Sequence, residues 1–262
     1  MIRALINNNW VQIPENDLKI GTKTFAYKAG LYEIFRTMNY QPILLKTHLK
    51  RLFNNANSIG LNIGYPIQDI ITMLKQVIHE FPEPDQRVYI IAIPDNFIIY
   101  TSPLNLDSAI YNGVDVITIE GVRQTPEIKT TNKHLCQSAL EKAHKSGCFE
   151  AFLVDSNRNI YEGSKSNIFW VKDDELFAKS NNVLIGTTQT LIKKHSPFPI
   201  NDGTLNEQEL KTIDELFITN SGSGIVPVIS VNNQPINNYK IGNITTHLLT
   251  LYNEWINKET SW

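Results

Sequence analysis

The sequence contains little cysteine. Only Cys136 and Cys148 occur among its 262 residues, the first in a segment expected to be helical and the second just after Gly147, where that helix should stop. Proteins that depend on disulfides carry more cysteines, at regular spacings. The pair therefore argues against a disulfide framework, and a reducing cytoplasm is the compartment that we expect.

Long apolar runs, a strong net charge and clustered metal ligands are also missing. No apolar run approaches the roughly 20 residues of a membrane-spanning helix, and the first residues lack the sustained apolar segment of a secretory signal. The formal net charge of -2 gives no electrostatic reason to expect nucleic acid or an anionic membrane as a partner. The six histidines are scattered, so we expect no metal site.

The first hundred or so residues combine strand patterns with two amphipathic helices. Between Lys46 and Gly60, apolar residues recur at the i, i+3, i+4, i+7 spacing of one buried stripe that includes Ile59, and Gly60 is a natural helix stop. The other elements expected here are a strand pair at 1–13, a loop leading into a strand at 24–38, a short strand at Ile43–Leu45, a helix at 67–79, and strands at 87–93 and 97–101.

A domain boundary is expected around residues 104–112, where this pattern loosens. We assign residues 1–108 to a smaller N-terminal α+β domain and residues 109–262 to a larger C-terminal domain, so the predicted class is α/β with two α+β domains. The elements expected in the second part are strands at 114–119, 176–178 and 215–219 and a final amphipathic helix at about 244–257.

The stretch from Glu127 to Trp170 contains the residues best suited to chemistry. Lys129 lies between an extended segment and a helix start, which Thr131 or Asn132 could cap. A lysine amine can hold an aldehyde cofactor and then move protons. Glu162 lies at a strand end before a Gly-Ser-rich turn, and a carboxylate can keep a pyridine nitrogen protonated. On position alone, a surface lysine would explain Lys129. A turn glutamate beside Gly163 is the alternative for Glu162, but the Ser166-Asn167-Ile168-Phe169 sequence that follows argues against it.

Together the two motifs resemble the fold-type IV pyridoxal-phosphate enzymes, which include branched-chain aminotransferases, D-amino-acid aminotransferases and aminodeoxychorismate lyases. In that family a lysine in a Lys-x-x-Asn context forms the Schiff base with the cofactor, and a glutamate in a Glu-Gly-x-x-x-Asn-hydrophobic-Phe context pairs with the pyridine nitrogen. Both patterns are present in the same order, at Lys129–Asn132 and Glu162–Phe169. The resemblance implies pyridoxal 5'-phosphate as cofactor, Lys129 as the catalytic residue and Glu162 as a cofactor ligand.

The same resemblance implies three contacts to the cofactor phosphate. Arg51 follows the His-Leu-x pattern that opens the first long helix in the family. The family's Gly-Ile-Thr-Arg motif corresponds to Gly186–Gln189, so Thr187 and Thr188 keep the hydroxyls and helix N-terminus while Gln189 replaces the arginine. Ser221 and Gly222 follow a strand that matches the family's Asp-Glu-Leu-Phe strand, and they fall where phosphate contacts are expected.

Substrate contacts are less well defined. Tyr32 and Glu33 match the Tyr-Glu or Phe-Glu pair near the active-site mouth of the aminotransferases, and the resemblance places Tyr32 on the substrate side of the cofactor. Arg36 could bind a substrate carboxylate. A core tyrosine and a charge at a strand edge fit these two positions equally well.

Three departures from the family leave the substrate open. Pro94-Asp95 stands where an Arg-Gly pair is often found, Lys133 stands where branched-chain enzymes have a tyrosine, and Lys165 lies in a turn that usually has small residues. The predicted function is an aminotransferase that acts on an α-amino acid and a 2-oxo acid. Two alternatives remain: an aminodeoxychorismate lyase, which releases p-aminobenzoate and pyruvate, and a family member that has lost catalysis and acts as a binding protein.

The resemblance also implies a larger-scale arrangement. It predicts a C-terminal domain built on a strongly curved sheet, a cofactor in the cleft between the two domains, and a homodimer in which a loop of the partner could reach the substrate pocket.

Overall fold

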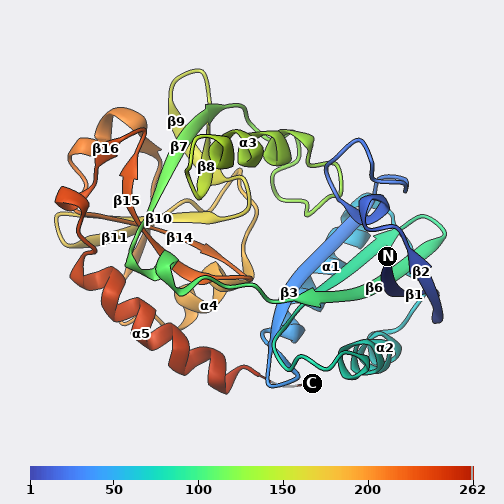
Figure 1. Ribbon diagram of the computed structural model, residues 1–262. Helices are drawn as coiled ribbons and strands as arrows, with labels where there is room; N and C mark the ends of the chain where they lie inside the picture. Colours follow the sequence, from blue (N-terminus) through green and yellow to red (C-terminus); the bar gives the residue numbers. More distant parts are fainter. Residues whose placement is uncertain (261) are drawn as a thin grey trace. The chain divides into compact units, whose positions relative to one another are not determined.

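The computed structural model describes residues 1–260 and 262, and this part of the chain divides into two compact units (Figure 1). The first unit comprises Met1–Asn105, Ile128–Lys133 and Ile256–Trp262. The second unit comprises Leu106–Glu127 and His134–Trp255. The short segment that carries Lys129 therefore belongs to the first unit, although the residues on both sides of it belong to the second.

The first unit is built on a six-stranded antiparallel sheet with the strand order β2-β1-β6-β5-β3-β4. The strands are β1 (Ile2–Ile6), β2 (Asn9–Ile13), β3 (Leu31–Met38), β4 (Gln41–Pro42), β5 (Gln86–Ile93) and β6 (Asn96–Pro103). Asn7 and Asn8, both with positive φ, form the turn of the first hairpin, which suits the asparagine side chain.

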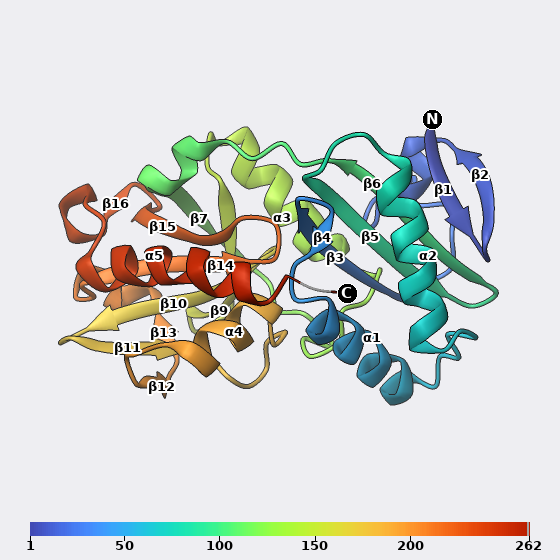
Figure 2. The same cartoon turned by 90° about the horizontal axis from the view of Figure 1, so that it is seen from below.

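Helices α1 (Leu45–Ile59) and α2 (Ile67–Glu80) belong to the same unit, and Figure 2 shows α2 crossing the strands of its sheet. Leu49 and Leu52 of α1 and Leu74 of α2 share one core with Phe35 of β3. The apolar stripe expected on α1 is confirmed up to Ala56. Ile59 is 47% exposed, so the prediction that it belongs to the buried stripe was wrong. The helix ends at Gly60, where φ is +68°.

One short strand was predicted in the wrong place. No strand forms at Ile43–Leu45, where one was expected. Leu44 has a left-handed backbone (φ 57°) and turns the chain directly into α1. The extended pairing lies earlier, at Gln41–Pro42. Helix α3 (His134–Lys145) begins two residues after Asn132, and the Thr131 hydroxyl accepts a hydrogen bond from Gly30 N (2.9 Å).

The second unit is built on a strongly curved ten-stranded sheet with the order β12-β11-β10-β14-β15-β7-β8-β9-β13, and β16 pairs with β15. Three pairs are parallel (β11–β12, β15–β7 and β7–β8) and the others are antiparallel. The strands are β7 (Val114–Glu120), β8 (Glu150–Val154), β9 (Asn159–Gly163), β10 (Asn167–Lys172), β11 (Glu175–Ala178), β12 (Ile200–Asp202), β13 (Leu205–Asn206), β14 (Glu215–Asn220), β15 (Gly224–Val231) and β16 (Gln234–Pro235).

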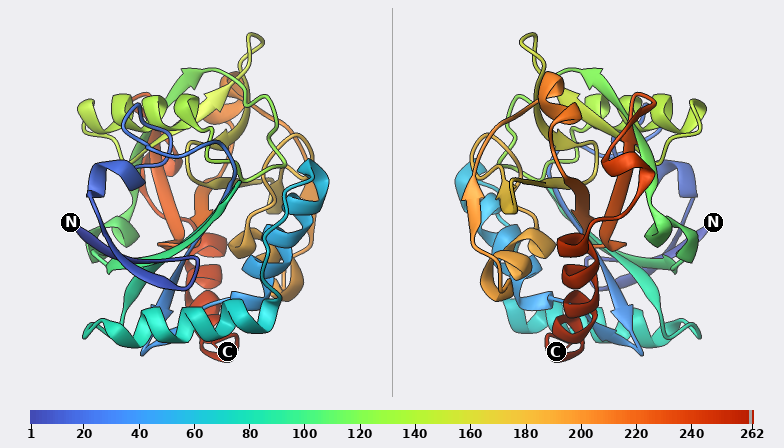
Figure 3. Two further views of the ribbon diagram at one scale, coloured as in Figure 1. Left: turned by 90° about the vertical axis from the view of Figure 1, so that its right-hand side faces the viewer. Right: turned by 90° about the vertical axis from the view of Figure 1, so that its left-hand side faces the viewer.

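Three helices accompany this sheet. Helix α3 places Cys136, Ala139 and Ala143 against Ala151 and Leu153 of β8. Helix α4 (Thr187–His195) packs against β14. Helix α5 (Asn243–Lys258) comes after the last strand in the sequence, and the right-hand view of Figure 3 shows it in dark red. None of the helices in the described residues has the length and apolar character needed to cross a membrane.

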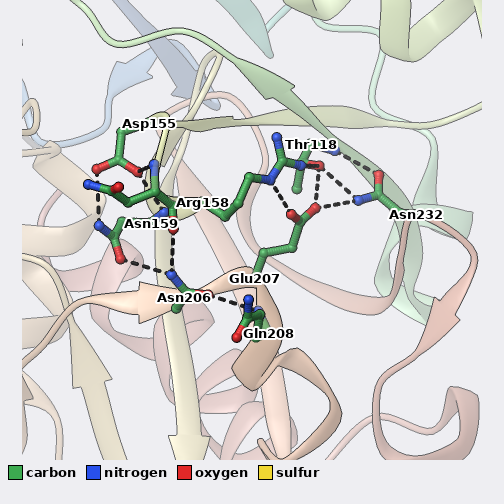
Figure 4. A network of polar contacts seen from close by, with 9 residues as sticks. Thr118, Asp155, Arg158, Asn159, Asn206, Glu207, Gln208 and Asn232 are labelled. Atoms are coloured by element: carbon green, nitrogen blue, oxygen red, sulfur yellow. Dashed lines mark hydrogen bonds and ion pairs between the residues drawn. The ribbon is translucent and has the colours of Figure 1, made fainter.

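A polar network joins four segments of the second unit (Figure 4). The carboxylate of Glu207, in the short 3-10 helix η3 (Glu207–Lys211), accepts from Arg158 Nε (2.5 Å), Thr118 Oγ1 (2.6 Å) and Asn232 Nδ2 (2.8 Å). The hydrogen bond from Arg158 is the main reason why the pKa of Glu207 is lowered. Turns that follow β8 and β15 are thus tied to β7 by charge-assisted hydrogen bonds.

We expect Leu52→Ala to lower the free energy of unfolding by about 2–5 kcal/mol, because Leu52 is 1% exposed in the core of the first unit. Ile59→Ala on the same helix is the matched control, and we expect it to change stability by no more than about 0.5 kcal/mol. Urea titration followed by circular dichroism measures both. Equal losses in the two variants would contradict the packing described for α1.

Candidate active site

Lys129 lies on a segment that runs beside the start of β3. Its backbone N–H donates to Asn55 Oδ1 of α1 (2.9 Å), and its carbonyl accepts from Tyr32 N (3.1 Å). Thr131 N donates in turn to Gly30 O (2.8 Å). The segment is therefore fixed by hydrogen bonds to both a helix and a strand of the first unit, although it has no regular secondary structure of its own.

The amine of Lys129 lies over an aromatic ring. Its Nζ is 4.5 Å from the centroid of the Tyr32 ring, and Lys133 Nζ is 5.5 Å from the same centroid. Burial lowers the pKa of Lys129, and the positive charges of Arg51 and Lys133 lower it further, while Tyr32 and Glu33 oppose the shift. A lowered pKa increases the fraction of neutral amine, which is the nucleophilic form.

Arg51 is oriented by a buried carboxylate. Glu33, which is fully buried on β3, accepts from Arg51 Nε (2.7 Å) and Nη2 (2.6 Å) and from His48 Nδ1 (2.7 Å). Burial alone would raise the pKa of Glu33, but the charge and hydrogen bonds of Arg51, with those of His48, lower it to about 2. Burial lowers the pKa of His48. Sequence reasoning found Arg51 but missed the roles of Glu33 and His48.

Glu162 is buried near the end of β9 in the second unit. Its Oε1 accepts from Arg123 Nη1 (3.0 Å) and its Oε2 from the backbone N–H of Leu184 (3.1 Å). Arg123 also donates to the carbonyl of Pro126 (2.8 Å), so the guanidinium is fixed as well. Sequence reasoning missed Arg123; a lone arginine shortly before the Lys129 segment was the only signal for it.

The start of α4 presents polar groups in a buried setting. Thr187 and Thr188 are 3% and 1% exposed, and the first N–H groups of any helix have no partner within that helix. Gln189, which replaces the family's arginine, accepts from Gly186 N (3.3 Å) and donates to the Lys179 carbonyl (2.9 Å). The glutamine therefore fixes the loop that precedes the helix, instead of presenting a positive charge.

The turn between β14 and β15 is shaped by Asn220. Its Oδ1 accepts from Gly222 N (2.9 Å) and Ser223 N (2.8 Å), while Ser221 and Gly222 are half-buried. The backbone N–H of Gly222 is thus already engaged by a side chain of the same turn.

Arg36 is a buried cation that faces another cation. It is 9% exposed on β3, and its Nε has no hydrogen-bond partner among the residues that the structure describes. Arg87 lies directly opposite on β5, and Ser102 lies opposite Arg87 on β6, so the three side chains form one row across the sheet. Because side chains alternate along a strand, Tyr32 lies on the same face as this row.

The predicted site residues thus fall into two groups. Lys129, Arg51, Tyr32 and Arg36 belong to the first unit, whereas Glu162, Thr187, Thr188, Ser221 and Gly222 belong to the second. Within the first group, Lys129 and Tyr32 are in direct contact. In the described part of the chain, no three His, Cys, Asp or Glu side chains are grouped as they would be to hold a metal ion.

The sequence and the fold of this chain are similar to those of known proteins. Residues 30–231 match the family described as amino-transferase class IV. The chain is 26% identical to the D-alanine aminotransferase of Staphylococcus aureus (strain N315), over 98% of each chain. It resembles the crystal structure of the branched-chain amino acid aminotransferase of Escherichia coli with a TM-score of 0.82 and 19% identity, over 99% of this chain and 96% of the other. It also resembles the branched-chain aminotransferase of the thermophilic archaeon Thermoproteus uzoniensis with norvaline (TM-score 0.83, 20% identity, 98% and 96% coverage).

The chain belongs to the class IV aminotransferase family, because the family match spans most of its length. The resemblance drawn from the motifs and the predicted fold class are confirmed. The protein is an aminotransferase that depends on pyridoxal 5'-phosphate.

The residues of the second unit fit the phosphate of that cofactor. In the second unit, three buried polar side-chain atoms lack a hydrogen-bond partner among the described residues: Thr188 Oγ1, Thr219 Oγ1 and Asn220 Nδ2. They lie at the start of α4 and the end of β14, two elements that pack against each other. An unpaired buried polar group costs about 1–3 kcal/mol, and a phosphate oxygen can accept from any of the three.

We expect Lys129→Met to raise the thermal unfolding temperature of the cofactor-free protein at pH 7. Because burial lowers the pKa of Lys129 below its ordinary value of 10.5, holding the amine charged in the folded state costs stability at neutral pH. The advantage of the variant should shrink as the pH rises through the lowered pKa toward 10.5, because the folded-state amine then loses its proton while the unfolded-state amine is still charged. Scanning calorimetry from pH 7 to 10 measures it, and an advantage that does not vary with pH would contradict the shift.

Proposed function

We propose that Lys129 carries out the transfer of an amino group between an α-amino acid and a 2-oxo acid. This role is supported by the position of the Lys129 amine over the Tyr32 ring and by its pKa, which burial lowers. A neutral amine can bind an aldehyde carbon covalently, and once released it can take a proton from the α-carbon of the substrate and later return it. When bound, pyridoxal phosphate accepts the electron pair that this proton leaves behind.

The other predicted residues would hold the cofactor. We propose that Glu162, fixed by Arg123 and Leu184, keeps a proton on the pyridine nitrogen. Arg51, Thr187, Thr188, Ser221 and Gly222 would bind the phosphate, and Asn220, which accepts from Gly222 N, would shape the turn that presents Ser221 and Gly222.

On the substrate side we propose roles for Tyr32 and Arg36. Tyr32 would line the pocket beside the Lys129 amine, and Arg36 would bind a substrate carboxylate. The support for Arg36 is its burial without a partner for Nε and its place opposite Arg87. An anion that pairs with Arg36 would compensate a buried charge and the repulsion between two guanidinium groups.

We also propose a cytoplasmic homodimer. Both cysteines are free thiols, which suits a reducing compartment, and the dimer is the arrangement that the family resemblance implies. Light scattering of the purified protein would test the oligomeric state.

Borohydride reduction followed by peptide mass spectrometry tests the role of Lys129. After incubation with pyridoxal phosphate, we expect the mass of the reduced cofactor on the peptide that contains Lys129 in the wild type and in Lys133→Ala, and no such mass in Lys129→Ala. Lys133 is the matched control because its amine approaches the same Tyr32 ring. Labelling of another lysine in the wild type would refute the assignment.

Amino acids added to the loaded protein separate the possible reactions. Loss of the cofactor's visible absorption with L- or with D-amino acids would establish the transaminase half-reaction and its handedness. An absorption band that depends on Lys129 but that no amino acid changes, together with release of p-aminobenzoate from aminodeoxychorismate, would favour the lyase. A loaded protein that is inert in both assays would favour a binding role.

We expect Arg36→Met to lower kcat/KM for the amino acid substrate by about 10–100-fold, because a hydrogen bond to a charged group contributes about 1.5–3 kcal/mol. The same variant should unfold at a higher temperature, since it removes a buried cation whose Nε has no partner among the described residues. Arg87→Met, a half-buried neighbour in the same row, is the control for the change in charge. Unchanged kcat/KM in Arg36→Met would exclude the carboxylate role.

A further inference from the structure

Glu150, at the start of β8, is a buried carboxylate to which the mechanism above gives no role. It is fully buried, and neutral donors surround it. Its Oε1 accepts from Ala151 N (2.8 Å), Ser164 N (3.2 Å) and the Ser164 hydroxyl, and its Oε2 accepts from Lys165 N (3.3 Å) and Ser166 Oγ (2.9 Å). Four of these five donors belong to the turn that follows Glu162.

The turn is built directly on this carboxylate. Gly163 N donates to Ser166 O (2.8 Å) and closes the turn. A Cβ atom on Gly163 would lie 2.1 Å from Ser166 Oγ and 3.1 Å from the carboxyl carbon of Glu150. The glycine after Glu162 is therefore required because the carboxylate and the serine hydroxyl occupy the space of a side chain.

Both ends of the turn hold the same residue, Leu184. Glu162, just before the turn, accepts from Leu184 N (3.1 Å), and Asn167, just after it, donates to Leu184 O (2.6 Å). Asn167 also lies against Gly186 at the start of α4, where a Cβ would meet Asn167 Oδ1 at 2.0 Å. The conformation of the turn thus determines where Glu162 lies relative to the first residues of α4.

We propose that Glu150 is a positioning residue of the cofactor site. Through the turn of residues 163–166 it sets the spacing between Glu162 and the N-terminus of α4. This inference rests on the proposed roles of Glu162 at the pyridine nitrogen and of Thr187 and Thr188 at the phosphate. Glu150 itself touches neither the cofactor nor the substrate.

The proposal requires a carboxylate and not only a polar side chain of the same size. A carboxylate offers acceptors on both oxygens, whereas the amide of a glutamine replaces one oxygen with two N–H donors. In Glu150→Gln that NH₂ group would face at least one backbone N–H that cannot accept a hydrogen bond, either Lys165 N on the Oε2 side or Ala151 N and Ser164 N on the Oε1 side. Donors that face each other without an acceptor force the turn to shift.

Glu215→Gln provides a matched control. Glu215 is a buried carboxylate in the same unit that also accepts from neutral donors, namely Ile244 N (3.0 Å), Thr245 N (2.7 Å) and Thr245 Oγ1 (2.6 Å). It holds the start of α5, not the turn after Glu162. Both glutamine variants should lose thermal stability, so a defect found only in Glu150→Gln cannot arise from general destabilisation.

Two measurements test the proposal, one with the cofactor and one without it. In Glu150→Gln we expect binding of pyridoxal phosphate to weaken at least about tenfold and the pH dependence of its absorption to shift, while Glu215→Gln keeps both wild-type values. In the cofactor-free protein we expect the Leu184 amide, which donates to Glu162, to exchange its hydrogen at least about tenfold faster in Glu150→Gln alone. If Glu150→Gln does not fold, Ser166→Ala removes one of the five hydrogen bonds and should give smaller changes in the same direction.

The outcomes separate this inference from the function on which it rests. Equal cofactor affinity, absorption profile and Leu184 exchange in the two glutamine variants would overturn the positioning role. Failure of the wild-type protein to bind pyridoxal phosphate would overturn the proposed function, and the exchange of Leu184 would still decide whether Glu150 holds Glu162 in place.

Discussion

The burial of carboxylates is the constraint on which the site depends. A carboxylate out of contact with water must be met by donors, and each buried glutamate here draws together segments that are distant in sequence. Glu33 ties β3 to Arg51 of α1, Glu162 ties β9 to Arg123 and Leu184, and Glu150 shapes the turn between β9 and β10. Residues with proposed chemical roles are thus fixed by hydrogen bonds whose loss would leave a buried charge unsatisfied and lower the stability of the fold.

Other buried polar atoms have no hydrogen-bond partner in the part of the chain that the structure describes. The Nε of Arg36 and the hydroxyl of Thr188 are buried and have no partner within the described residues. Each such group lowers stability unless a ligand meets it. Such groups are useful in a protein that binds an anionic cofactor and carboxylate substrates, because the bound ligands can accept the hydrogen bonds that these groups do not make within the protein.

Local patterns made much of the fold predictable. The spacing of Leu49 and Leu52 and the glycine at position 60 predicted α1 to within a residue, because a helix depends on neighbours three and four positions apart. The motifs around Lys129 and Glu162 likewise predicted the family. The partners of these residues could not be predicted, because Arg123 and Glu162 are 39 positions apart and Arg123 lies in a loop whose path has no local sequence signal.

The chain passes between the two compact units four times, at residues 105–106, 127–128, 133–134 and 255–256. A gene divided once, anywhere along its length, therefore cannot encode each unit as a separate polypeptide. A cut near residue 105 would leave Lys129 on the fragment that contains the second unit, away from β3 and α1, which hold its backbone. Any attempt to exchange one unit between relatives must carry the six residues from Ile128 to Lys133 as an insertion within the other unit.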